Sequence, residues 1–165
     1  MIKKLPRGTY FLMIGIILGG ILLDQLTKFL AVRYLAPVDT VPLWKNVLHL
    51  TYVENTGAAF GMMKDARWVF LILSTAAIVG IAVYLFFGYA RGTLATVAFS
   101  MIVSGGIGNM IDRIALGYVI DFIDFRLIHF AVFNGADSFV CVGAGLLVLS
   151  LILDILHEKK EKKNP

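Results

Sequence analysis

Apolar residues gather in four long runs along the chain, and most charged residues lie outside these runs. A helix of about 20 mostly apolar residues is long enough to cross the hydrocarbon layer of a bilayer. Asp24 and Lys28 interrupt the first run, and Asp154 lies near the end of the last one, which is short. We therefore predict four transmembrane helices, over Tyr10–Tyr34, Trp68–Tyr89, Leu94–Ile111 and Ala136–Leu156.

The composition excludes an ordinary soluble domain. Hydrophobic residues make up 59% of the 165 residues and charged residues only 16%, whereas soluble domains carry about 25% charged residues. The chain shows no internal repeat, no low-complexity linker and no second soluble module. We expect residues 1–165 to form a single integral membrane domain.

The first apolar run has one competing interpretation, a cleaved signal peptide. Lys3, Lys4 and Arg7 resemble the basic start of such a peptide, and Tyr10–Leu23 has the length of its apolar core. No small-residue cleavage site follows, and the apolar run resumes after Asp24. This pattern favours a retained first helix.

Two connecting segments have the composition of strands rather than helices. Residues 44–53 and 118–130 are rich in β-branched and aromatic side chains and alternate in places between apolar and polar. Open sheet edges are not stable in lipid, so these strands must pair with one another. The predicted fold is an all-α membrane protein with four transmembrane helices and a small extracytoplasmic β-sheet. Within 57–65, between the first two helices, Gly61-Met62-Met63 suggests a short flap segment.

Basic residues predict the orientation in the membrane. Lysine and arginine are densest in the two tails and are also present in the 88–93 loop, and such residues mark the cytoplasmic side. We expect both termini in the cytoplasm, with segments 36–66 and 114–135 outside. The basic tails can attract anionic phospholipid headgroups, which accounts for the net charge of +4 without any nucleic acid.

Two aspartates carry the candidate chemistry. Asp121 and Asp137 lie in short polar motifs between apolar runs, where a carboxylate is costly and usually functional. Two like charges about 4 Å apart repel by roughly 4 kcal/mol at an effective dielectric constant near 20, so one of them keeps a proton. Asn134 has the sequence position of an N-cap, which puts Asp137 in the first helical turn, where ionisation is favoured. We expect Asp121 to be the protonated acid and Asp137 the base that activates water.

Other catalytic schemes fit the residues less well. The three histidines lack the spacing of metal ligands and one cysteine is too few for a zinc site, so we expect no metal and no cofactor. A serine–lysine peptidase would use Ser138 and Lys28, but Asp24 one turn away keeps the lysine charged and a poor base. We expect the single cysteine, Cys141, to be a small buried apolar side chain.

A small four-helix transporter with outward-facing carboxylates is the main alternative from another class. Transporters place ionisable residues along a path near the bilayer midplane, whereas the acids and amides here gather toward one side. Asp24 and Lys28 are four residues apart on one helix, and two roles stay open for them. They either form a self-contained ion pair or have a substrate or support role at the site.

Five short motifs occur in a fixed order, and together they resemble the lipoprotein signal peptidases (signal peptidase II), a family of bacterial membrane aspartic peptidases. The likeness extends from the first predicted helix to the start of the fourth. Gly135 departs from it, since a larger apolar residue is common there, and it is expected to loosen the turn before Asp137. The motifs are Asp24-Gln25-x-Thr27-Lys28, Asn55-x-Gly57-Ala58-Ala59-Phe60, Gly108-Asn109-x-x-Asp112-Arg113, Val119-Ile120-Asp121-Phe122 and Phe133-Asn134-x-Ala136-Asp137-Ser138.

The resemblance implies an aspartic endopeptidase of the bacterial cytoplasmic (inner) membrane with its active site at the outer face. Its partners would be membrane phospholipids and a lipidated prolipoprotein, whose signal peptide is cut just before a diacylglyceryl-modified cysteine. The resemblance also implies roles for twelve residues. Asp121 and Asp137 would be catalytic; Asn55, Asn109, Arg113 and Asn134 would bind substrate; Asp24, Lys28, Asp112, Gly57, Ala136 and Ser138 would be supporting.

Overall fold

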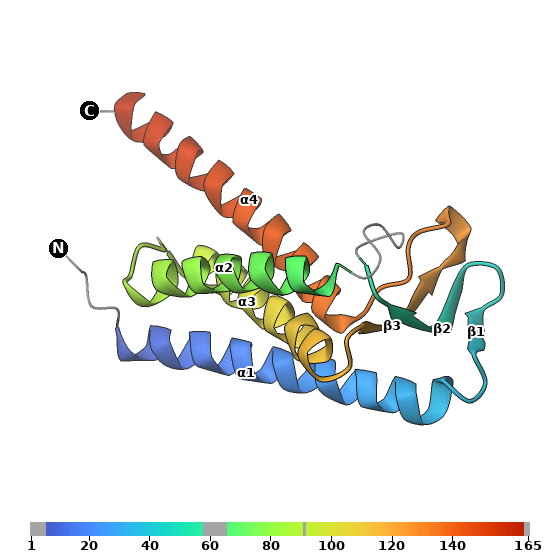
Figure 1. Cartoon of the computed structure of the whole chain (residues 1–165). Coiled ribbons are helices and arrows are strands. Elements are labelled where there is room, and N and C mark those ends of the chain that lie inside the picture. Colours follow the sequence, from blue (N-terminus) through green and yellow to red (C-terminus); the bar gives the residue numbers. More distant parts are fainter. Residues whose placement is uncertain (1–5, 58–65, 91, 164–165) are drawn as a thin grey trace.

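Four long helices and one three-stranded sheet make up the described part of the chain, residues 6–57, 66–90 and 92–163 of a computed structural model (Figure 1). The sheet lies at one end of the helices, and the two termini lie at the other end (Figure 1). The elements are α1 (Arg7–Leu30), the π-helical η1 (Ala31–Leu35), β1 (Thr40–Trp44), β2 (Leu48–Asn55), α2 (Arg67–Phe86), α3 (Gly92–Ala115), β3 (Val119–Phe125), the 3-10 helix η3 (Arg126–Ile128) and α4 (Gly135–Lys163).

All four helices are long and apolar enough to cross a membrane, which confirms the prediction of a multi-pass membrane protein. The predicted end of the last helix at Leu156 was wrong, because α4 continues to Lys163. The lysines and glutamates of this tail are good helix formers and extend the helix beyond its apolar part. The second helix ends earlier than predicted, at Phe86, before a turn in which Gly88 has a φ of 74°.

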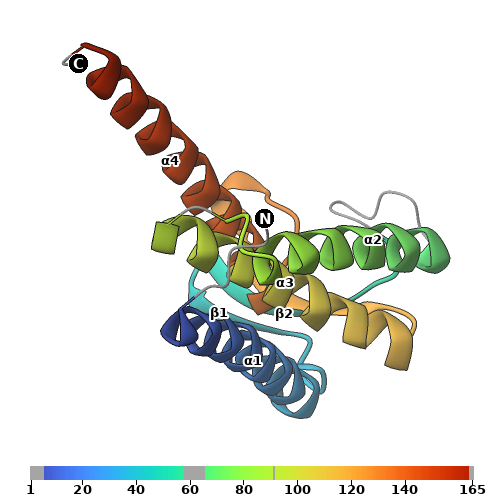
Figure 2. The same ribbon diagram turned by 90° about the vertical axis from the view of Figure 1, so that its left-hand side faces the viewer.

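Helix α3 is the centre of the bundle and contacts α1, α2 and α4. Figure 2 shows it between α1 and α2, while α4 leans away from the bundle toward its C-terminus. Two glycines of α3 allow α1 and α4 to approach it closely. A methyl group at Gly105 would collide with the Ala136 carbonyl oxygen of α4, and one at Gly108 would lie 2.5 Å from the Asp24 Oδ2 atom of α1.

The sheet is antiparallel, with β2 between β1 and β3. The strand predicted over 44–53 is divided, because a turn with Asn46 at a φ of 62° separates β1 from β2. The strand predicted over 118–130 ends at Phe125 and passes into η3 and then His129, which has a φ of 50°. The proposed flap lies outside the described residues, apart from Gly57.

Candidate active site

The two candidate catalytic aspartates lie on different elements and line one cavity of about 710 Å³. Asp121 lies in the middle of β3 and is only 2% exposed. Asp137 lies in the first turn of α4. Sixteen positions apart in the sequence, the two carboxyl groups thus reach the same space.

Asn134, which is fully buried, connects the two carboxyl groups. Its Nδ2 donates to Asp121 Oδ1 over 2.7 Å, and its Oδ1 accepts a hydrogen bond of 2.9 Å from the backbone N–H of Asp137. The Asn134 N–H donates in return to Asp137 Oδ2 over 3.2 Å. This reciprocal pattern is a capping box, so the predicted N-cap is confirmed. Because the Asp137 N–H can only donate, the carbonyl oxygen of the amide faces it and the NH₂ group faces Asp121.

Two further asparagines complete the hydrogen bonds of the pair. Asn109 Nδ2 donates to Asp137 Oδ1 over 2.7 Å, and Asn55 Nδ2 donates to Asp121 Oδ2 over 2.9 Å. In the described ranges, the ion pairs of the chain involve other carboxylates. Asp121 and Asp137 are therefore solvated by neutral N–H groups rather than by a cation.

The surroundings of Asp121 raise its pKa into the neutral range. Burial raises the pKa of Asp121 to about 7; the hydrogen bond from Asn55 lowers it, the charge of Asp137 raises it further, and the hydrogen bond from Asn134 lowers it. Burial has the largest effect because a charged carboxylate loses its hydration there.

A second cluster adjoins the two catalytic candidates, Asp121 and Asp137, which we call the dyad. This cluster, the polar junction, is formed by Asp24, Gln25 and Lys28 of α1 and Asp112 of α3. Lys28 Nζ lies 2.9 Å from Asp24 Oδ2 and 2.8 Å from Asp112 Oδ2, and its side chain is 2% exposed. Lys28 also donates to Asn109 Oδ1 over 2.9 Å. The interpretation of Asp24 and Lys28 as a self-contained pair is therefore wrong.

The polar junction also fixes backbone segments that lead to the dyad. Asp24 Oδ1 accepts a hydrogen bond of 2.8 Å from the N–H of Ala136, and Asp112 Oδ2 accepts one of 3.1 Å from the N–H of Ile120. Ala136 directly precedes Asp137, and Ile120 directly precedes Asp121. The junction thus holds both aspartates in place through their neighbours.

Arg113 and Gly57 also line the cavity that contains the two aspartates. Arg113 Nη2 donates to the Gly57 carbonyl oxygen over 3.2 Å, and the guanidinium lies 4.9 Å from the centre of the Phe70 ring. The Gly57 N–H donates to Asn55 Oδ1 over 2.9 Å, which orients that amide toward Asp121. Arg113 lines the cavity together with Asn109, one helical turn earlier.

Near the start of α4, Gly135 and Ser138 belong to the same turn. A methyl group at Gly135 would meet Asp24 Oδ1 at 3.5 Å, an ordinary contact, and the capping box closes the turn. Ser138 lines the cavity and its hydroxyl donates to the Asn134 carbonyl oxygen over 3.0 Å. Ten of the twelve residues singled out in the sequence thus line the cavity or belong to the polar junction, and the other two, Asn134 and Ala136, hydrogen-bond to them.

Cys141 is exposed and lines the cavity, so its prediction as a buried side chain was wrong. It lies four residues after Asp137, and residues with this spacing share a face of a helix. Sequence reasoning also missed most of the apolar lining, which comes from α2, from the segment before α4 and from α4 itself. This lining includes Phe70, Phe130, Ala131, Val132, Phe133 and Val142, with Ser74 beside them.

Comparison with known proteins decides the family. The family model described as signal peptidase (SPase) II matches residues 16–153. The chain belongs to the signal peptidase II family. This is a family of aspartic peptidases, so the predicted resemblance and the predicted class of enzyme are both confirmed, and nothing favours the transporter alternative.

Relatives and solved structures agree with membership in the signal peptidase II family. A lipoprotein signal peptidase of Brevibacillus brevis is 41% identical over 145 residues, which cover 88% of this chain and 95% of that protein. One of Caldanaerobacter subterraneus is 48% identical over 128 residues, covering 77% and 86%. A solved bacterial membrane enzyme aligns with a TM-score of 0.79 at 31% identity and covers 94% of both chains. A second one aligns with a TM-score of 0.77 at 32% identity and covers 92% of this chain and 97% of its own.

Proposed function

We propose that this enzyme removes signal peptides from lipidated prolipoproteins and that Asp121 and Asp137 activate the water molecule that cuts the chain. The observation that carries the proposal is the position of Asn134, which hydrogen-bonds both carboxyl groups in one cavity. The relatives named lipoprotein signal peptidase support this class of substrate.

In this mechanism the two carboxyl groups share one proton. Asp121 holds this proton in mildly acidic solution and loses it only around pH 7, because burial raises its pKa to about 7. Asp137 lies at the N-terminus of α4, where the helix dipole and two N–H donors stabilise a carboxylate. Asp137 accepts a proton from water as the oxygen attacks the peptide carbonyl carbon, and Asp121 protonates the carbonyl oxygen. When the C–N bond breaks, the proton on Asp137 passes to the leaving amine, and one hydroxyl proton of the tetrahedral intermediate returns to Asp121.

The same cavity has side chains suited to an unwound substrate. A helical substrate must open its backbone hydrogen bonds near the cut, and the freed groups are costly in an apolar environment. Arg113 and Asn55 line the cavity and can bond such groups. The apolar wall that includes Phe70 and Val142 would take acyl chains and apolar side chains.

We place the dyad at the outer face of the bacterial inner membrane, with both termini in the cytoplasm. The dense basic residues of the two tails support this orientation. Both termini lie at the end of the helices opposite the sheet, as this requires (Figure 1). Phospholipids surround the helices in this arrangement, and the chemistry needs no metal ion.

Cleavage of a purified lipidated prolipoprotein, followed by its gel shift, tests the proposal. Asp121→Asn and Asp137→Asn should each lower turnover by several orders of magnitude while the variants stay folded. Asp124→Asn is the matched control, because Asp124 lies on the same strand but pairs with Arg126 at 2.8 Å. Substantial cleavage by either dyad variant would reject the mechanism.

A further inference from the structure

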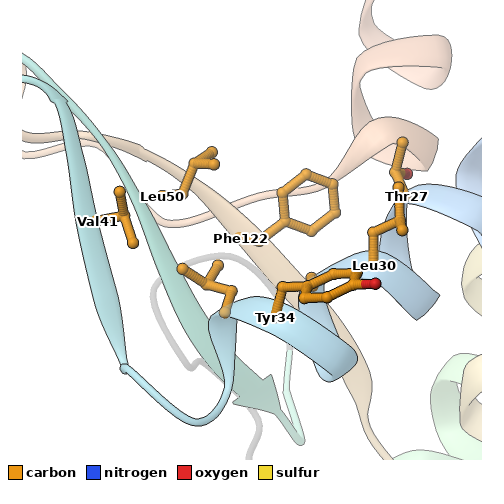
Figure 3. A pocket seen from close by; sticks show the side chains of 8 residues that line it. Thr27, Leu30, Tyr34, Val41, Leu50 and Phe122 are labelled. Atoms are coloured by element: carbon orange, nitrogen blue, oxygen red, sulfur yellow. The ribbon is translucent and has the colours of Figure 1, made fainter.

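A second cavity, of about 370 Å³, lies between the end of α1, η1 and the sheet. Figure 3 shows side chains from these elements around it, including Leu30 and Tyr34 from the helical side and Val41, Leu50 and Phe122 from the strands. The hydroxyl of Thr27, also in the lining, is already bonded to the Asp24 carbonyl oxygen over 2.8 Å. The cavity therefore presents an almost entirely apolar surface.

Strand β3 separates this apolar cavity from the catalytic cavity. Successive side chains of a strand point to opposite faces. Asp121 lines the catalytic cavity, and the next residue, Phe122, lines the apolar one. Whatever fills the apolar cavity therefore supports the strand that carries Asp121.

The apolar cavity is continuous with the bilayer-facing surface of α1. This helix spans the membrane, and Leu26 and Phe29 on it are 50% and 63% exposed. Leu30 and Tyr34, which are 43% and 68% exposed, extend this surface to the cavity itself. Acyl chains of the bilayer therefore meet the opening of the apolar cavity.

Polar groups of the sheet are occupied elsewhere. Thr51, next to Leu50, donates to Asp124 over 2.7 Å, and Asp124 pairs with Arg126. These groups take no part in the lining. Water gains few partners in such a space, and apolar cavities stay dry.

We propose that an acyl chain of a bilayer phospholipid occupies the apolar cavity and holds β3 in the position that the dyad requires. Removing the lining from contact with water stabilises the occupied state. The occupant is a bilayer lipid rather than the lipid of the substrate, because β3 stands between this cavity and the dyad. The lipidated cysteine adjoins the bond that is cut, so its chains start on the other side of the strand. The effect on cleavage rests on the proposed function, whereas the occupancy does not.

Photo-labelling tests the occupancy directly. The full chain is placed in vesicles of phosphatidylcholine that carries a diazirine on its acyl chain, without substrate, and the labelled residues are identified by mass spectrometry. We expect adducts on Leu50 and Phe122. We also expect them on Ala31 and Leu35, which line the cavity and are only 6% exposed. Adducts confined to exposed residues such as Phe29 would overturn the proposal.

Two variants fill the cavity from two neighbouring strands, β1 and β2, so the test does not depend on one of them folding. Val41→Trp and Leu50→Trp should each lower the labelling of Phe122 several-fold. Leu43→Trp is the control, because Leu43 lies on the same strand as Val41, is 59% exposed and does not line the cavity. Equal labelling in all three folded variants would contradict the proposal.

A cleavage assay then separates the possible occupants and the two proposals. Phosphatidylcholine added to delipidated enzyme in detergent should raise cleavage several-fold, and Val41→Trp should reduce this rise.

Loss of the Phe122 adducts on adding unlabelled lipidated substrate would show that the substrate's lipid is the occupant and overturn the proposal. Adducts inside the cavity without any cleavage of prolipoprotein would leave the occupancy standing and reject the proposed function.

Discussion

Among the described residues, two pairs of carboxylates lie close together, and they differ in what solvates them. Asp24 and Asp112 share the ammonium group of Lys28, with distances of 2.9 and 2.8 Å. Asp121 and Asp137 receive their hydrogen bonds from amide and backbone N–H groups. A cation between two carboxylates cancels their repulsion and holds them in place. Neutral donors leave the repulsion between the two carboxylates, and a bound proton relieves it.

One side chain links the two pairs. Asn109 Oδ1 accepts from Lys28 over 2.9 Å, and its Nδ2 donates to Asp137 over 2.7 Å. Because an ammonium can only donate, Lys28 fixes which end of the amide faces the dyad. The polar junction thus positions the dyad through Asn109, and the charge of Lys28 also lowers the pKa of Asp121.

Removing the cation should have the largest effect on stability. Lys28→Met leaves two buried carboxylates without their partner, and breaking such a buried pair costs about 3–5 kcal/mol. Unfolding in mixed micelles, followed by circular dichroism, measures the loss. Lys45→Met, at an exposed position in a turn, is the control and should change the stability little. Equal stability of the two variants would show that the polar junction does not stabilise the fold.

Removing the Asp121 carboxylate should change how the stability of the protein depends on pH. The pKa of Asp121 rises from 3.8 to about 7 on folding, so its contribution to stability is full below pH 3.8 and is lost as the pH rises through about 7. The stability of Asp121→Asn relative to the unchanged protein should therefore increase over this range, by a few kcal/mol at most.

Asp124→Asn is the control for this pH dependence. Burial raises the pKa of Asp124, but the hydrogen bonds from Arg126 and Thr51 outweigh it and hold the pKa below 3.8. Its contribution is therefore present above pH 3.8 and is lost only in more acidic solution. A flat profile for Asp121→Asn in thermal unfolding across the same range would contradict the account of the dyad.

A smaller effect is expected from one hydrogen bond to the dyad. The profile of kcat/KM should fall above about pH 7, where Asp121 loses its proton. Asn55→Ala removes a donor that lowers the pKa of Asp121, so this fall should move to higher pH. Thr51→Val, which alters a hydroxyl bonded to Asp124, should leave the profile in place. A shift to lower pH in Asn55→Ala would reverse the assigned role.

The smallest expected effect is that of chelators. Because the proposed acid and base are two carboxyl groups, EDTA should leave the initial rate of prolipoprotein cleavage unchanged. Enzyme incubated with EDTA and then supplied with excess Mg²⁺ or Zn²⁺ is the control. Loss of activity that a metal restores would show that the dyad does not act alone.

The sequence predicted the spans and the polar residues of the site because each leaves a local signal. Apolar runs of sufficient length specify the helices, and Asn134 followed three residues later by Asp137 specifies a cap. The partners of Lys28 left no such signal, since Asp112 and Asn109 lie on another helix and only packing at Gly108 brings them near. The exposure of Cys141 and the turn at Asn46 likewise depend on tertiary structure and backbone conformation.

The protonation of Asp121 is the central claim, and infrared difference spectroscopy of the folded enzyme against Asp121→Asn measures it most directly. We predict a protonated carboxyl band that is present in mildly acidic solution, half lost at about pH 7 and absent in alkaline solution. An Asp121 that is already fully ionised near pH 5, well below that midpoint of about 7, would contradict the account.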